Sequence, residues 1–266
     1  MSRFRHIIGP QRRRAGFTLL ELVVAAALMA GLLILVFQIV SAVLNPWTRE
    51  TDRVTAALQA DAALDALAAD LQSIAVGAGG TVLHIPADPA SGEPLRLLRR
   101  DPAGDLSVVA YWIDRWTPGA GREVPALFAA ALPPEAAWTA LQAAEDSDIF
   151  DALGTGAFPP PGPDTLLAVG VVNFEVIAWI REGGTTRRAD PTAGTGALHF
   201  PLETPDSGNI LPVFLDLRLR ILSNTGLDRL AALRDGSSEF PVETEADIHD
   251  RFATTFHRRI RLPATR

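Results

Sequence analysis

The stretch of sequence that decides the fold covers residues 17–44 and reads FTLLELVVAAALMAGLLILVFQIVSAVL. Residues 22–37 contain no polar side chain, and the polar residues of the whole stretch are Thr18, Glu21, Gln38 and Ser41. A helix of this length extends for about 42 Å, which exceeds the roughly 30 Å hydrocarbon core of a membrane. The stretch therefore predicts a membrane-spanning helix.

Charge is distributed unevenly around this stretch. Residues 1–16 hold five arginines and no acid, whereas the rest of the chain holds 19 arginines and 31 acids. Basic flanks favour the cytoplasmic side of a membrane, so we expect the segment after residue 44 to lie on the other side. An acidic body also argues against nucleic acid as a partner, because phosphate contacts need a basic surface.

Two other interpretations of the apolar stretch are a secretory signal peptide and a plain membrane anchor. A signal peptide has an apolar core of about 7–15 residues before a small-residue cleavage site, and this stretch is longer. A plain anchor does not explain Glu21, because a carboxylate inside a membrane helix costs on the order of 3 kcal/mol without a partner. Glu21 therefore indicates a functional need for a charge.

Residues 14–25 read RAGFTLLELVVA: a glycine, a phenylalanine, a glutamate four residues later and then an apolar helix. This pattern resembles the processing motif of the type IV prepilin family. The resemblance implies that an inner-membrane prepilin peptidase cleaves between Gly16 and Phe17 and N-methylates the new N-terminus. It also implies that Glu21 pairs with the N-terminal amine of a neighbouring subunit during assembly.

The chain after the apolar stretch predicts an α+β protein. We expect Asn45 and Pro46 to kink or interrupt the helix, because proline removes a backbone donor. The helix should then resume with an amphipathic pattern, with apolar side chains at Val54, Leu58, Leu64, Leu67, Leu71 and Ile74. The expected organisation is a leader over residues 1–16, a transmembrane helix over 17–44, an amphipathic continuation over 45–76 and a β-rich periplasmic head over 77–266.

Short β-type runs separated by turn residues predict the strands of the head. These runs cover residues 81–85, 95–99, 106–114, 166–180, 197–202, 213–222 and 252–262. Residues 227–233 predict a short helix. Residues 118–162 predict a long irregular excursion with some helix around residues 135–144.

Several of these runs resemble the strand pattern of the minor pseudopilin J of type II secretion. They cover residues 106–115, 170–176, 211–222 and 256–263, of which the last is arginine-rich and ends in Leu262 and Pro263. A PilW-like minor pilin is a near alternative, as is a prepilin-like protein of another secretion cassette. The resemblance implies an inner-membrane protein whose partners are the prepilin peptidase and other minor and major pseudopilins or pilins.

The sequence offers little support for an enzyme or a cofactor. It has no cysteine, and it lacks the nucleotide-binding and nucleophile motifs that would indicate catalysis. The five histidines show no metal-ligand spacing. Asp146, Asp148 and Asp151 are weak candidates for calcium ligands, although a solvated loop explains them better. The aromatic residues Tyr111, Trp112 and Trp116 predict core packing rather than a ligand platform.

Two hypotheses about function therefore remain open. The first is a structural subunit near the tip of a periplasmic pseudopilus of type II secretion, assembled through lateral packing of the apolar helices. The second is a type IV minor pilin or tip-located binding module, whose head recognises a substrate or surface ligand.

Overall fold

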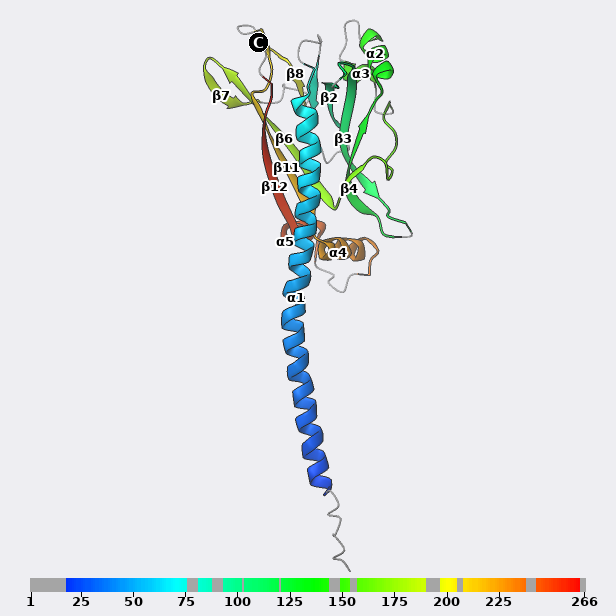
Figure 1. Ribbon diagram of the computed structural model, residues 1–266, viewed down its shortest axis with the longest axis vertical. Helices are drawn as coiled ribbons and strands as arrows, with labels where there is room; N and C mark the ends of the chain where they lie inside the picture. Colours follow the sequence, from blue (N-terminus) through cyan, green and yellow to red (C-terminus); the bar gives the residue numbers. More distant parts are fainter. Residues whose placement is uncertain are drawn as a thin grey trace, which may run out of the picture. The chain divides into compact units, whose positions relative to one another are not determined.

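The computed structural model describes residues 18–75, 81–87, 93–101, 103–119, 121–143, 149–153, 157–189, 197–204, 208–237 and 243–263. It divides into two compact units, Met1–Glu50 and Thr51–Arg266. A long helix α1 (Leu19–Gln72) precedes a β-rich head, so the predicted α+β fold is confirmed (Figure 1).

Helix α1 is continuous through Asn45 and Pro46, so the expected interruption at this point is absent. Proline removes one backbone donor from a helix, but the turns on either side keep their own hydrogen bonds. In a helix of 54 residues that local loss is not enough to end the element.

The head contains a larger antiparallel sheet on one side of α1 (Figure 1). Its described strands are β1 (Leu83–Ile85), β2 (Leu95–Arg100), β3 (Leu106–Trp116), β4 (Val124–Ala131), β5 (Leu166–Val169) and β8 (Leu198–Phe200). They lie in the order β5-β4-β3-β2-β1-β8. We call this the first sheet.

The second sheet has the order β12-β11-β6-β7 and is also antiparallel. It contains β6 (Val171–Glu182), β7 (Thr185–Arg188), β11 (Phe214–Leu222) and β12 (Ala253–Arg261). Along β11 the residues Leu215, Leu217, Leu219 and Ile221 are buried, which confirms the apolar face predicted from the alternating pattern. A separate pair is formed by β9 (Leu202–Thr204) and β10 (Gly208–Ile210).

One predicted strand, residues 166–180, is divided between the two sheets. Gly170 separates β5 from β6 and has a φ of 81°, a conformation that side chains other than glycine rarely adopt. A Cβ atom at this position would also lie 3.1 Å from the carbonyl oxygen of Leu222. The chain therefore passes from the first sheet to the second at a glycine.

The predicted irregular excursion over residues 118–162 is partly wrong, because it contains β4. This strand pairs with both β3 and β5, and most of its side chains are buried. A strand buried on both faces does not show the alternation that reveals a half-exposed strand. The expected helix near residues 135–144 is present as α2 (Pro134–Ala143), and a short α3 (Ile149–Leu153) follows it.

Two helices lie near the start of β12 and the end of β11. The predicted helix over residues 227–233 is confirmed as α4 (Asn224–Arg234), with Ser223 as its N-cap. Helix α5 (Glu245–Phe252) was not expected, and it replaces the first residue of the strand predicted over 252–262. It begins with a capping box between Thr244 and Asp247, a local signal of a helix start that was present in the sequence.

Within the head, the second part of α1 packs into one apolar core shared with both sheets. The predicted face is correct at Leu64, Leu67, Leu71 and Ile74, but wrong at Val54 and Leu58, which are 50% and 66% exposed. Small side chains take their place in the core at Ala56, Ala60 and Ala63. The periodic pattern assigns large apolar side chains to the buried face of α1. Where the helix approaches the sheets closely, however, only a small side chain such as alanine fits between them.

Candidate functional site

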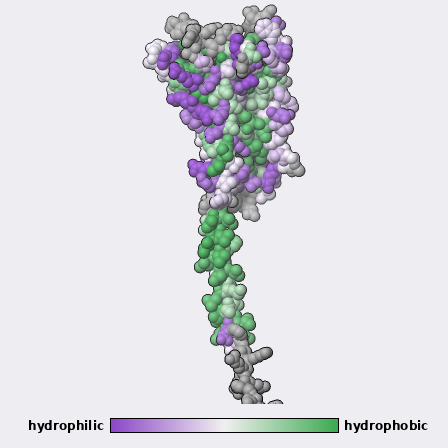
Figure 2. Space-filling view, viewed as in Figure 1, coloured by the Kyte–Doolittle hydropathy of each residue, from purple (hydrophilic) through white to green (hydrophobic). Residues whose placement is uncertain are grey.

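The first part of α1 carries the most unusual surface of the chain. A segment of 26 residues, Leu19–Leu44, is long and apolar enough to cross a membrane, and none of it is buried within the chain. Large side chains such as Leu28, Leu32 and Phe37 are 63% to 73% exposed. In Figure 2 the visible face of this segment is hydrophobic over most of its length. Such a surface requires lipid or apolar partners around it.

Glu21 is the single charged residue of this segment, and its carboxylate contacts the start of its own helix. Its Oε2 accepts hydrogen bonds from the backbone N–H of Thr18 at 3.0 Å and from the Thr18 hydroxyl at 3.1 Å. The Thr18 Oγ1 in turn accepts from the backbone N–H of Glu21 at 3.3 Å. Together these bonds form a capping box, Thr-x-x-Glu, which satisfies backbone donors at a helix start.

This capping role of Glu21 was not predicted from the sequence. The signal was present, because a threonine followed three residues later by a glutamate before an apolar run is typical of a helix start. Glu21 therefore has a local structural role in the isolated chain, in addition to the role that the resemblance implies.

Acids on α1 attach the helix to the head. The Asp70 carboxylate accepts a hydrogen bond from the hydroxyl of Tyr111 at 2.5 Å and pairs with Arg99, both on the first sheet. Burial raises the pKa of Tyr111, and the neighbouring carboxylate of Asp70 adds to that rise. On the second sheet, Arg258 pairs with Asp65. These contacts fix the rotation of α1 against both sheets.

A second polar contact between α1 and the head involves Asp52, which precedes Asp65 and Asp70 along the helix. The Asp52 carboxylate accepts hydrogen bonds from the side-chain amide of Asn224 at 2.9 Å and from the Thr225 hydroxyl at 3.3 Å. Because both partners lie in the first turn of α4, this contact joins α4 to α1. It could not be read from the sequence, since 172 positions separate Asp52 from Asn224.

Inside the second sheet, Asp216 joins three strands. It is 4% exposed and accepts from Nε and Nη2 of Arg259 at 2.6 and 2.8 Å and from the indole N–H of Trp179 at 2.8 Å. The hydrogen bonds from Arg259 lower the pKa of Asp216 most, against the opposing effect of burial. The cluster is structural, because every polar group of the carboxylate is used within the sheet.

His84 and His199 lie close together on the first sheet. His84 is buried, its Nε2 lies 3.0 Å from Glu93 Oε1, and its ring lies 4.5 Å from that of His199. Burial lowers the pKa of His84 most, and His199 adds to that effect. Across the described ranges no group of three or more metal-ligating residues is close enough to hold an ion.

The remaining predicted site residues can be tested only in part. Gly16 and Phe17 lie outside the described residues, as do the calcium candidates Asp146 and Asp148. Asp151 belongs to α3, but its side chain is not described. The roles of all five stay predictions.

Comparison with known proteins identifies the N-terminal segment. Residues 11–37 match a model described as the prokaryotic N-terminal methylation motif. The chain carries this methylation motif. It is the signal of type IV pilins and pseudopilins, so the predicted prepilin-like segment is confirmed. The match covers Glu21, together with the Gly16–Phe17 position at which processing was predicted. The more specific J-type class is not distinguished by the methylation motif.

Among solved structures, one that resembles this chain is a type IV-like pilin from Thermus thermophilus. The two share 14% identity with a TM-score of 0.37, over 78% of this chain and 96% of the other. None of the curated proteins compared matches the chain significantly. The methylation motif and the apolar segment that follows it are the features that indicate a function.

Proposed function

We propose that the chain is a membrane-anchored minor pseudopilin, a structural subunit of a type II secretion pseudopilus that lies near its tip. One observation carries the proposal: the methylation motif leads directly into an apolar helix whose side chains are all left for an external apolar environment. A second compact unit, Thr51–Arg266, contains the end of α1 and the β-rich head.

The proposed topology follows from charge. The five arginines among residues 1–16 stay in the cytoplasm, residues 17–44 cross the inner membrane, and the acidic head lies in the periplasm. A prepilin peptidase cleaves between Gly16 and Phe17 and methylates the new amine. Other pseudopilins then pack along the apolar segment, and the head does not act as an enzyme.

Glu21 has a proposed second role in the assembled state. After cleavage, it lies four residues from the new N-terminus at Phe17. A carboxylate within the apolar layer is stabilised by an amine of opposite charge, since two buried charges together avoid much of the cost of either alone. We assign the N-terminal amine of a neighbouring subunit as that partner.

A type IV minor pilin with a ligand-binding head is a second candidate. The observation that favours it is the partial exposure of Trp112 beside a hollow on the head, where the sequence predicted core packing. Gene neighbours discriminate the two candidates. Secretin and secretion ATPase genes favour type II secretion, and a retraction ATPase gene favours a pilus.

The proposal is tested by the N-terminus of the native protein. Intact mass and N-terminal sequencing of the chain purified from membranes should give a product that starts at Phe17 and carries one added methyl group. A Gly16→Val variant should stay at full length in the same cells. A mature chain that starts beyond Leu44 would show an ordinary cleaved secretory signal and reject the proposal.

A further inference from the structure

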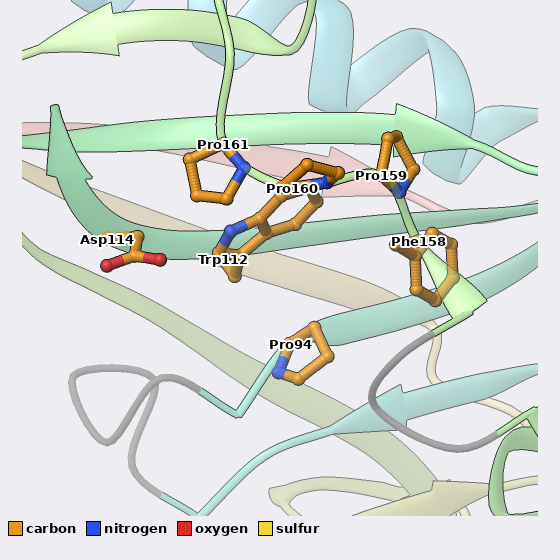
Figure 3. A pocket seen from close by; sticks show the side chains of 7 residues that line it. All are labelled: Pro94, Trp112, Asp114, Phe158, Pro159, Pro160 and Pro161. Atoms are coloured by element: carbon orange, nitrogen blue, oxygen red, sulfur yellow. The ribbon is translucent and has the colours of Figure 1, made fainter.

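A small groove lies on the face of the first sheet that is turned away from α1. Its volume is about 240 Å³, and it is lined by Pro94, Trp112, Asp114, Phe158 and the prolines 159–161 (Figure 3). This volume is below the roughly 300–1,000 Å³ of sites for drug-sized ligands. It is suited to a single side chain of a partner.

The strand register explains why these residues meet. Tyr111 points toward α1, where it contacts Asp70, so its neighbour Trp112 points to the opposite face of β3. Asp114 lies two residues further along β3 and shares that face. Pro94 directly precedes β2, whose first residue Leu95 pairs with Tyr111, and it lines the groove together with Trp112.

One wall of the groove is rigid before any partner arrives. Phe158 lies 6.4 Å from Trp112 between ring centroids, and the prolines 159–161 follow it directly. Three consecutive prolines have fixed φ angles, so little conformational freedom is lost when a ligand contacts them. Phe128 stacks on Trp112 at 5.9 Å and helps to hold the indole in place.

The polar chemistry of the groove is dominated by acceptors. Prolines have no backbone N–H, so this wall offers carbonyl oxygens only. Asp114 adds a carboxylate whose Oδ1 accepts from the backbone N–H of Arg115 at 2.7 Å. Within the described part of the chain, Asp114 forms no ion pair and the Trp112 indole N–H has no acceptor. Arg96, a cation on the neighbouring strand, donates to the Phe150 carbonyl at 2.8 Å and is buried.

We propose that this groove binds an arginine side chain from an extended segment of a partner protein. A guanidinium group supplies five donors, matches a carboxylate, and packs its flat surface against aromatic rings. The carboxylate of Asp114 provides the opposite charge, and Trp112 and Phe158 provide the apolar contact. An acidic segment would be repelled by Asp114.

The groove lies on the face of the first sheet opposite to α1, so a neighbouring subunit that contacts α1 does not have to cover it. A partner bound in this groove contacts the head and leaves α1 free for neighbouring subunits of either kind of filament.

The test uses the full chain in detergent micelles with the indole nitrogens labelled by nitrogen-15. The probes are the peptides acetyl-Pro-Arg-Pro-amide and acetyl-Pro-citrulline-Pro-amide, which have nearly the same shape but differ in charge. A Trp112→Phe variant identifies the Trp112 indole signal by its loss. The arginine peptide should shift that signal in a saturable way, and the citrulline peptide should bind at least about fivefold more weakly.

Two variants test whether the carboxylate of Asp114 attracts the arginine peptide. Asp114→Asn should weaken binding of the arginine peptide by about twofold to fivefold, the range expected for an exposed ion pair. Asp164→Asn is the matched control, because Asp164 is an exposed acid near the prolines that does not line the groove. It should leave binding unchanged. Thermal melting checks that all variants are folded.

The proposal is overturned if the two peptides bind equally or if neither shifts the Trp112 signal. It is also overturned if Asp164→Asn weakens binding as much as Asp114→Asn, because the attraction would then be a general effect of the acidic head. A saturable shift that depends on both the arginine charge and Asp114 supports it.

Discussion

Replacing Glu21 by glutamine separates the two roles that this residue has been given. Glutamine at this position can still accept hydrogen bonds from Thr18, so the capping box is kept, but the charge is removed. Glu21→Leu removes both the cap and the charge. Thr18→Ala removes the hydroxyl of the box and keeps the charge.

The two roles differ in expected size. Loss of a helix cap costs about 1 kcal/mol, and a helix of 54 residues tolerates that at its first turn. Loss of a charge partner within the membrane is worth on the order of 3 kcal/mol. Because about 1.4 kcal/mol corresponds to a factor of ten, the second effect weakens association of subunits by roughly a hundredfold.

Co-purification of cross-linked neighbouring subunits measures assembly, and carbonate extraction measures membrane insertion. We expect Glu21→Gln and Glu21→Leu to insert normally, to be cleaved at Gly16, and to lose most assembly. Thr18→Ala should assemble nearly as well as the natural chain. Gln38→Leu is a control for removal of a polar group elsewhere in the segment. If Glu21→Gln assembles normally while Glu21→Leu does not, the hydrogen bonds of the cap matter and the argument from charge fails.

Three further predictions concern the head. A fragment that starts at Thr48 should be soluble and melt cooperatively, since residues 51–266 share one compact core, and a disordered circular dichroism spectrum would contradict this. Tyr111→Phe should lower the free energy of unfolding by about 2 kcal/mol in denaturant titration, because it removes a buried donor to Asp70, whereas the exposed control Asp61→Ala should change it by less than about 1 kcal/mol. Asp216 has a lowered pKa in the folded state, so its contribution to stability is present at neutral pH and is lost as pH falls below about 4. Asp216→Asn should therefore be less stable than the natural chain at pH 7, and its melting temperature should fall less on acidification. Melting temperatures of the two proteins that change in parallel with pH would refute this role of Asp216.

The sequence determined the long apolar helix and the methylation motif for a local reason. An apolar run of this length, a basic flank and one glutamate at a fixed spacing are all properties of neighbouring residues. The strand β11 was equally readable, because one of its faces is apolar and the other is largely charged. In both cases, the pattern of apolar and polar side chains lies within a single helix or strand, so neighbouring residues are enough to reveal it.

Other features depend on partners that are distant in the chain. Strand β4 was missed because burial on both faces removes its alternation, and the exposure of Val54 and Leu58 depends on how closely α1 approaches two sheets. The contact of Asp52 with α4 likewise joins segments that share no local pattern.

The sequence by itself therefore determined that this chain has a methylation motif, an apolar helix long enough to cross a membrane, and a β-rich head. Only the tertiary structure decided that small residues of α1, rather than Val54 and Leu58, enter the core, and that Pro94, Trp112, Asp114 and Phe158 surround one groove. The physical reason is that a helix or a signal motif is specified by contacts a few residues apart. A groove on a sheet is specified by register between strands and by the loop that packs over them.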